Sequence, residues 1–117
     1  MKRDLDVIRR LLLWAEASPA RGRSIEGFRM DGCSEADMLE HARLAHETGL
    51  IEAKFLGRDL CHVHRLTWEG HEFLRAYRND TGWIRIKRLA IDAGLPLTLE
   101  VMKDLVPEVL RKMAGMR

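Results

Sequence analysis

The stretch GLIEAKFLGRDLCHVHRLTWEG, residues 49–70, predicts a β-hairpin set between two helices. Gly49 follows a helical pattern and suits the left-handed residue that commonly ends a helix. Two short runs with alternating apolar residues, 51–56 and 61–66, flank Gly57-Arg58-Asp59, which has the length and glycine content of a hairpin turn. Thr67 suits the N-cap of the next helix. This order predicts the second half of a winged helix-turn-helix domain, with the hairpin as its wing.

Helical periodicity covers most of the remaining chain. Apolar residues recur at helical spacing over residues 4–17, 34–48, 67–77, 83–93 and 98–113, and Pro107 should kink or divide the last of these segments. We expect residues 24–30 to hold a short strand that pairs with the hairpin. The predicted fold class is therefore α+β, mostly α: a winged helix-turn-helix-like domain with a β-hairpin wing and additional C-terminal helices.

Side-chain alternation predicts which residues of these elements face the core. On the second hairpin strand, Cys61, Val63 and Arg65 should share one face, and His62, His64 and Leu66 the other. The tryptophans occur at helical spacing beside Leu, Ile or Phe, so we expect Trp14, Trp68 and Trp83 to pack in the core rather than to form a base-stacking platform. In 83–93, the residues expected to point inward are Trp83, Ile86, Leu89 and Ala90.

Length and composition bound the organisation of the chain. A sequence of 117 residues with 46% hydrophobic content is large enough for one core. We expect a single domain over 1–117, with a core over 1–94 that includes hairpin 51–66, and a helical extension over 95–117 that is a candidate homodimer contact. No apolar run approaches the roughly 18 residues of a membrane span, and no cleavable signal is present, so we expect a cytoplasmic protein that does not bind membranes.

The distribution of charge yields two sets of candidate binding residues. The net charge of +2 is too small to indicate nucleic-acid binding by itself. A DNA interface would use basic residues of the 34–48 helix and of the wing, namely Arg43, His46, Lys54, Arg58 and Arg65. The same helix carries four acids against one arginine, and these would repel phosphates. The acids form the alternative, partner-binding set: Glu35, Asp37, Glu40 and Glu47.

Catalytic and metal-binding signatures are absent from the sequence. The two cysteines, Cys33 and Cys61, lie far apart, and neither has structural-zinc spacing with the five histidines. Cys61 and His62 are adjacent on a strand, so they should face opposite sides and cannot act as an activated pair. We therefore expect no enzymatic activity, no cofactor and no metal.

Three passages resemble a family of small bacterial and phage proteins grouped as a domain of unknown function. They are LTWEGHEFLRAYRNDTGW at 66–83, MKRDLDVIRRLL at 1–12, and the segment 41–53, which ends in GLIEA. The resemblance covers nearly the whole chain. It implies a winged-helix-like fold in prophage-associated proteins and implies no established activity.

Two functions fit these observations. The first is a phage- or prophage-associated DNA-binding regulator that uses the wing. The alternative is a protein-interaction module, or phage inhibitor, that binds a host nucleic-acid-processing or defence complex through its acidic helix 34–48.

Overall fold

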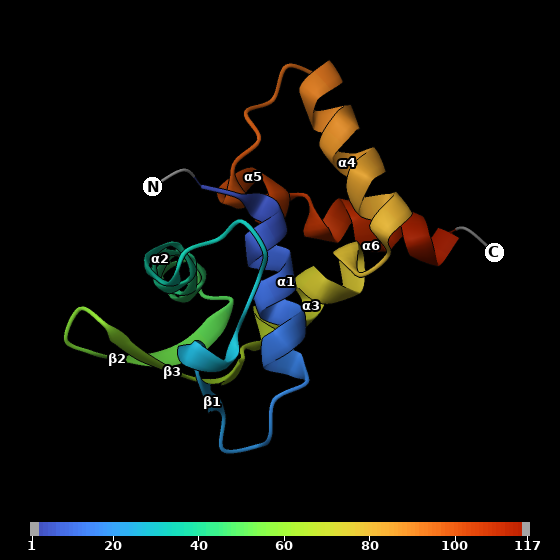
Figure 1. Ribbon diagram of the computed structural model, residues 1–117. Coiled ribbons are helices and arrows are strands. Elements are labelled where there is room, and N and C mark those ends of the chain that lie inside the picture. The colour runs from blue at the N-terminus through green and yellow to red at the C-terminus, as the bar shows by residue number, and fades with distance from the viewer. Residues whose placement is uncertain (1–2, 116–117) are drawn as a thin grey trace. The chain divides into compact units, whose positions relative to one another are not determined.

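The computed structural model describes residues 3–115, which form helices and a small antiparallel sheet (Figure 1). In chain order the elements are α1 (Leu5–Glu16), β1 (Arg23–Ser24), the 3-10 helix η1 (Ile25–Gly27), α2 (Glu35–Glu47), β2 (Ile51–Leu56), β3 (Leu60–Leu66), α3 (Trp68–Tyr77), α4 (Asp80–Asp92), α5 (Leu99–Asp104) and α6 (Val106–Gly115). The predicted α+β, mostly helical class with a hairpin wing and extra C-terminal helices is confirmed.

Two compact units divide the chain, Met1–His71 and Glu72–Arg117, and the division falls within α3. The first unit has the winged-helix-like order of a helix, a short strand, a second helix and a hairpin. The second unit holds the end of α3 together with α4, α5 and α6. The partition expected after residue 94 stays a prediction.

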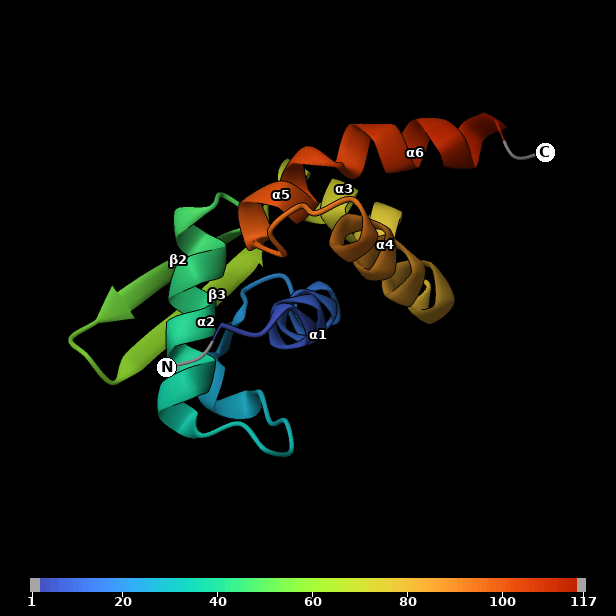
Figure 2. The ribbon, with the colours of Figure 1, turned by 90° about the horizontal axis from the view of Figure 1, so that it is seen from above.

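In the first unit, α1 and α2 pack against each other and against the sheet, whose strand order is β1-β3-β2 (Figure 2). Its buried core includes Ile8, Leu11, Leu12, Ala42, Ala45, Leu50 and Val63. The strand predicted within 24–30 is shorter than expected, because only Arg23 and Ser24 pair with β3. Ser24 then caps η1 by accepting a hydrogen bond from the Glu26 N–H. A 3-10 turn thus stands where a standard winged helix has a full helix.

Local capping groups set the boundaries of these helices. The Ser34 side chain accepts from the Asp37 N–H at 3.1 Å and begins α2. Gly49 has φ +80° and follows the end of the same helix. Asn79 caps α4 by accepting from the Gly82 N–H at 3.0 Å. Each of the two capping bonds spans three residues and so depends on local sequence, although α4 begins at Asp80, before the expected start at residue 83.

Aromatic rings form the centre of the second unit. Tyr77 lies edge-on to Phe73 and Trp83, with ring centroids 4.8 and 5.2 Å apart. Its hydroxyl donates to the Met102 carbonyl at 2.5 Å and so joins α3 to α5. Burial raises the pKa of this hydroxyl far above its usual range. Pro107 is the second residue of α6, and the predicted break before it is confirmed.

Two residues expected in the core are exposed instead. Trp68 is 76% exposed and Leu89 is 52% exposed, so the predicted core positions of both are wrong. Around α3, Trp68 lies about 140° from Phe73, and Leu89 of α4 lies about 120° from Trp83, because a helix advances roughly 100° per residue. Among residues 3–115, no helix is both long enough and apolar enough to cross a membrane.

Candidate nucleic-acid interface

The hairpin of β2 and β3, residues 51–66, is the wing of the first unit. Its tip is a three-residue turn in which Gly57 has φ +67°, and Leu56 pairs with Leu60 on either side. The tip extends beyond α2 in two views at right angles (Figures 1 and 2). The side of the sheet away from α1 and α2, here called the outer face, is therefore open around the tip.

A β-bulge changes which wing residues face the core. Glu52 pairs with Arg65 but Ala53 pairs with Val63, so His64 is an extra residue on β3. Beyond the bulge the alternation is reversed: Leu66 is buried, and Arg65 points to solvent. The predicted faces of Arg65 and Leu66 are wrong for this reason, since one inserted residue moves all later side chains to the opposite face.

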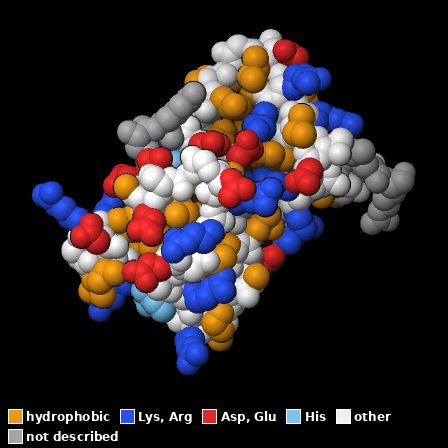
Figure 3. Space-filling model, in the orientation of Figure 1, with side chains coloured by type: hydrophobic (Ala, Val, Ile, Leu, Met, Phe, Trp, Pro, Cys, Tyr) orange, Lys and Arg blue, Asp and Glu red, His pale blue; other side chains and the backbone are white. Residues whose placement is uncertain are grey.

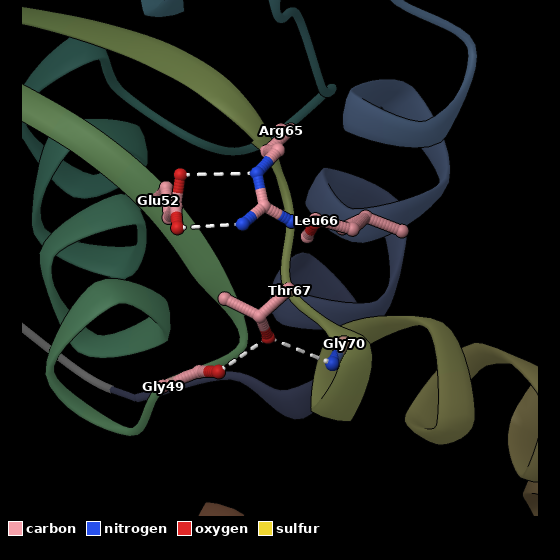
Figure 4. A network of polar contacts seen from close by, with 6 residues as sticks. All are labelled: Gly49, Glu52, Arg65, Leu66, Thr67 and Gly70. Carbon is pink, nitrogen blue, oxygen red and sulfur yellow. Dashed lines mark hydrogen bonds and ion pairs between the residues drawn. The ribbon is translucent and has the colours of Figure 1, made fainter.

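Arg65 is held by an acid of the neighbouring strand (Figure 4). Its Nε and Nη2 donate to the two carboxylate oxygens of Glu52 at 3.0 and 2.7 Å, and its Nη1 donates to the Leu66 carbonyl at 3.0 Å. Such a two-pronged pair uses the geometry with which arginine would bind a phosphate. Of the five predicted DNA contacts, Arg65 is thus engaged within the wing.

Arg43 and His46 of α2 both contact Phe55 of β2. The Arg43 guanidinium lies 4.5 Å from the Phe55 ring centroid, and the His46 ring lies 5.5 Å from it in an edge-on geometry. Arg43 also lies 3.8 Å from the carboxylate of Glu40. These contacts place the two predicted residues between α2 and the wing, where they help to join the two elements.

Lys54 and Arg58 are the predicted DNA contacts whose side chains are exposed and not engaged in an ion pair among residues 3–115. Both are exposed, and neither makes an ion pair within the described part of the chain. Lys54 lies on the outer face, and Arg58 is the central residue of the tip. Over the part of the molecule that contains the sheet, Lys, Arg and His side chains gather with a few acids between them (Figure 3).

His62 and His64 extend this outer face, although neither was among the predicted contacts. His62 is the cross-strand partner of Lys54, and its ring centroid lies 5.0 Å from that of His64. Its Nε2 donates to the Arg21 carbonyl at 2.9 Å. Gly22 permits this approach, because a Cβ there would lie 2.2 Å from the Val63 carbonyl oxygen. Strand alternation predicted that His62 and His64 share a face, and the contact between their rings confirms it.

The four acids of the alternative site lie along α2. Glu35, Glu40 and Glu47 are exposed, whereas Asp37 is half-buried near the helix start. Glu35 lies 3.7 Å from Arg29, and Glu40 lies 3.8 Å from Arg43, so two of the acids are partly compensated. Exposed pairs of this length contribute little energy, and the face keeps its acidic character.

The cysteines show no activated chemistry. Burial raises the pKa of the Cys61 thiol to about 11, and burial with the nearby carboxylates of Asp37 and Asp4 raises that of Cys33. A reactive thiol would need the opposite shift. Within residues 3–115, no three His, Cys, Asp or Glu side chains are grouped so that they could hold a metal ion.

Comparison with known proteins gives a family for the chain. The model of a family described as hypothetical protein (DUF2513) matches residues 2–96. The chain belongs to this family. It is also 36% identical over 118 residues to an uncharacterized protein of Haemophilus influenzae, and the match covers 97% of this chain and 98% of the relative. No solved structure matches the chain. The resemblance to a domain of unknown function is thus confirmed.

Proposed function

We propose that this protein is a non-enzymatic, DNA-binding regulator, associated with phages or prophages, that contacts DNA through its wing. The observation that carries the proposal is the pair of exposed cations, Lys54 and Arg58, on a hairpin that extends beyond α2. A hairpin tip of this kind can reach phosphates or a groove, and phosphate neutralisation supplies most non-specific affinity.

The engaged side chains narrow the expected contact. Arg65 is bound by Glu52, and Arg43 and His46 pack on Phe55. We therefore do not expect these three side chains to contact DNA. His62 is the cross-strand partner of Lys54 and donates to the Arg21 carbonyl, whereas the exposed imidazole of His64 beside it offers a hydrogen-bond donor to a phosphate backbone. The wing, rather than α2, is therefore the proposed contact surface.

The test is the salt dependence of binding to a labelled random DNA duplex. We expect the full chain to bind at low salt and to lose affinity as salt rises, because cations condensed on DNA are released by each phosphate contact. The double variant Lys54→Gln/Arg58→Gln should reduce the slope of log affinity against log salt by about two, since each contact contributes roughly 0.9 to it.

Arg111→Gln is the matched control for this test. Arg111 is an exposed arginine of α6 that lies outside the wing, 2.9 Å from Glu108. Its replacement should leave the slope close to that of the unchanged chain. Absence of binding at low salt, or an equal slope for the wing variant, would overturn the proposal.

The second candidate function is a protein-interaction module, or phage inhibitor, that binds a basic surface of a host nucleic-acid-processing or defence complex. The exposed acids Glu35, Glu40 and Glu47 on one helix favour it. Complementary charge would set the specificity and the association rate of such a complex.

Charge reversal on α2 distinguishes the two functions. Glu40→Lys/Glu47→Lys should strengthen DNA binding, because it removes carboxylates that repel phosphates. The same variant should lose a basic protein partner that the unchanged chain retains in affinity purification from host cells. Loss of such a partner, combined with no DNA binding at low salt by either chain, would favour the interaction module.

A further inference from the structure

A groove in the first unit lies apart from the wing and from the acidic face of α2. It has a volume of about 700 Å³ and runs between α1 and the stretch that follows η1. Its walls are Arg10, Leu13, Trp14, Gly27, Phe28, Arg29, Met30 and Asp31. The volume is within the range of small-molecule sites.

The indole of Trp14 has an unusual hydrogen-bonding state. Its Nε1–H is buried and has no acceptor in the structure. The large majority of buried side-chain polar atoms in proteins have a hydrogen-bond partner, so an unpaired N–H of a residue in the wall of a groove is consistent with an acceptor from outside the chain.

The surroundings of Trp14 limit how an acceptor can approach. The Arg23 guanidinium covers one face of the indole at 4.6 Å, and the Phe28 ring lies 5.7 Å away. Gly27 packs against the edge of the ring, where an added Cβ would lie 3.4 Å from Trp14 Cζ2. A ligand would therefore meet the indole at its edge, after a small outward shift of residues 27–31, rather than stack on its face.

Cationic side chains border the groove on both sides. Arg10 of α1 and Arg29 of the opposite wall are both exposed, and Asp31 is the acid among the groove residues. Arg29 lies 3.7 Å from Glu35, an exposed pair that a ligand could replace at little cost. Leu13, Phe28 and Met30 supply apolar wall beside these cations.

We propose that this groove binds a small organic anion: an apolar body that carries a carboxylate or a phosphate. One oxygen of the acidic group accepts the Trp14 indole N–H, and Arg10 and Arg29 neutralise its charge. The apolar body lies against Leu13, Phe28 and Met30. The inference does not depend on DNA binding, because none of these residues belongs to the wing.

Nuclear magnetic resonance of the full chain tests the site directly. The indole N–H signal of Trp14 is assigned by its loss in Trp14→Phe, and benzoate, phenyl phosphate and neutral benzyl alcohol serve as probes. We expect benzoate or phenyl phosphate to shift this signal saturably at concentrations up to ~10 mM, with the signals of Trp68 and Trp83 unmoved. The more effective of the two identifies the acidic group as a carboxylate or a phosphate.

Arginine variants separate a specific site from weak surface binding. The double variant Arg10→Gln/Arg29→Gln should reduce the affinity for the anion by about tenfold, since charge-assisted hydrogen bonds are lost. Arg58→Gln, at the wing tip, should leave the anion affinity unchanged while it weakens DNA binding. Equal shifts with benzyl alcohol, equal affinity in the Arg10/Arg29 variant, or no shift with either anion would overturn the proposal.

Discussion

His41 shows how one side chain joins two segments of the first unit. Its ring is 1% exposed, Nε2 accepts the Asp4 N–H at 2.9 Å, and Nδ1 lies 2.6 Å from the Asp37 carbonyl. Both bonds form only if the proton is on Nδ1, so the fold selects one tautomer. The imidazole thereby links the N-cap of α1 to α2 and has no ring nitrogen left for catalysis or for a metal.

Cys61 gives a prediction at the same scale. Burial raises the pKa of its thiol from 9.0 to about 11. Above about pH 9 the thiol of the unfolded chain ionises while the native thiol keeps its proton, so the unfolded state binds fewer protons and stability falls as pH rises. Between about pH 8 and pH 10 this should cost about 1 kcal/mol of unfolding free energy.

Denaturant unfolding at the two pH values measures this cost, and Cys61→Ala is the comparison. The variant lacks the ionisable group, so its unfolding free energy should fall by about 1 kcal/mol less over the same interval. All other titrating groups are common to both chains. An identical pH dependence would show that the Cys61 thiol does not couple ionisation to folding.

At the scale of elements, the turn from the wing into α3 depends on a close backbone approach. Thr67 Oγ1 donates to the Gly49 carbonyl at 2.5 Å and accepts from the Gly70 N–H at 3.1 Å (Figure 4). A Cβ at Gly70 would lie 2.1 Å from the Leu50 carbonyl oxygen. The Thr67-Trp68-Glu69-Gly70 sequence therefore combines a helix cap with the absence of a side chain where the backbone of residue 50 passes.

Glycine substitutions test this packing. Gly70→Ala should destabilise the protein by about 1–3 kcal/mol, because the new methyl group forces the helix away from Leu50. Gly82→Ala is the matched control within a helix, where the nearest atom to the new Cβ would be Asn79 Cβ at 3.8 Å. This control should stabilise by up to about 1 kcal/mol through helix propensity. Thermal or denaturant midpoints of the two variants that shift in the same direction would contradict the packing argument.

At the scale of the whole molecule, charge is distributed unevenly between the two units. Met1–His71 contains 11 Lys/Arg and 12 Asp/Glu, a net charge of −1, whereas Glu72–Arg117 contains 9 and 6, a net charge of +3. DNA binding by the wing would thus depend on local rather than overall charge. Given its net charge of +3, the second unit would add non-specific attraction to DNA, so the wing variant is expected to lose part of the salt dependence and not all of it.

The candidate sites were predictable to different degrees. Lys54 and Arg58 could be placed correctly because a strand position and a hairpin tip are local features. The pairing of Arg65 with Glu52 could not be predicted, since it depends on a β-bulge, and no residue type in β3 indicates where that bulge lies. The groove beside Trp14 was also beyond prediction, because α1 and residues 27–31 meet only in the folded chain.

The sequence by itself determined the order of the elements, their caps and the hairpin tip. Ser34, Gly49, Gly57 and Thr67 act through bonds or torsion angles within a few residues, so their effects do not depend on the rest of the fold. Only the tertiary structure decided which side chains are buried and which are exposed to solvent or to a partner. One extra residue at His64 reversed the faces of Arg65 and Leu66, and packing between elements buried His41 while it left Trp68 in solvent. Periodicity gives the spacing of a face, whereas contacts between distant segments decide what covers it.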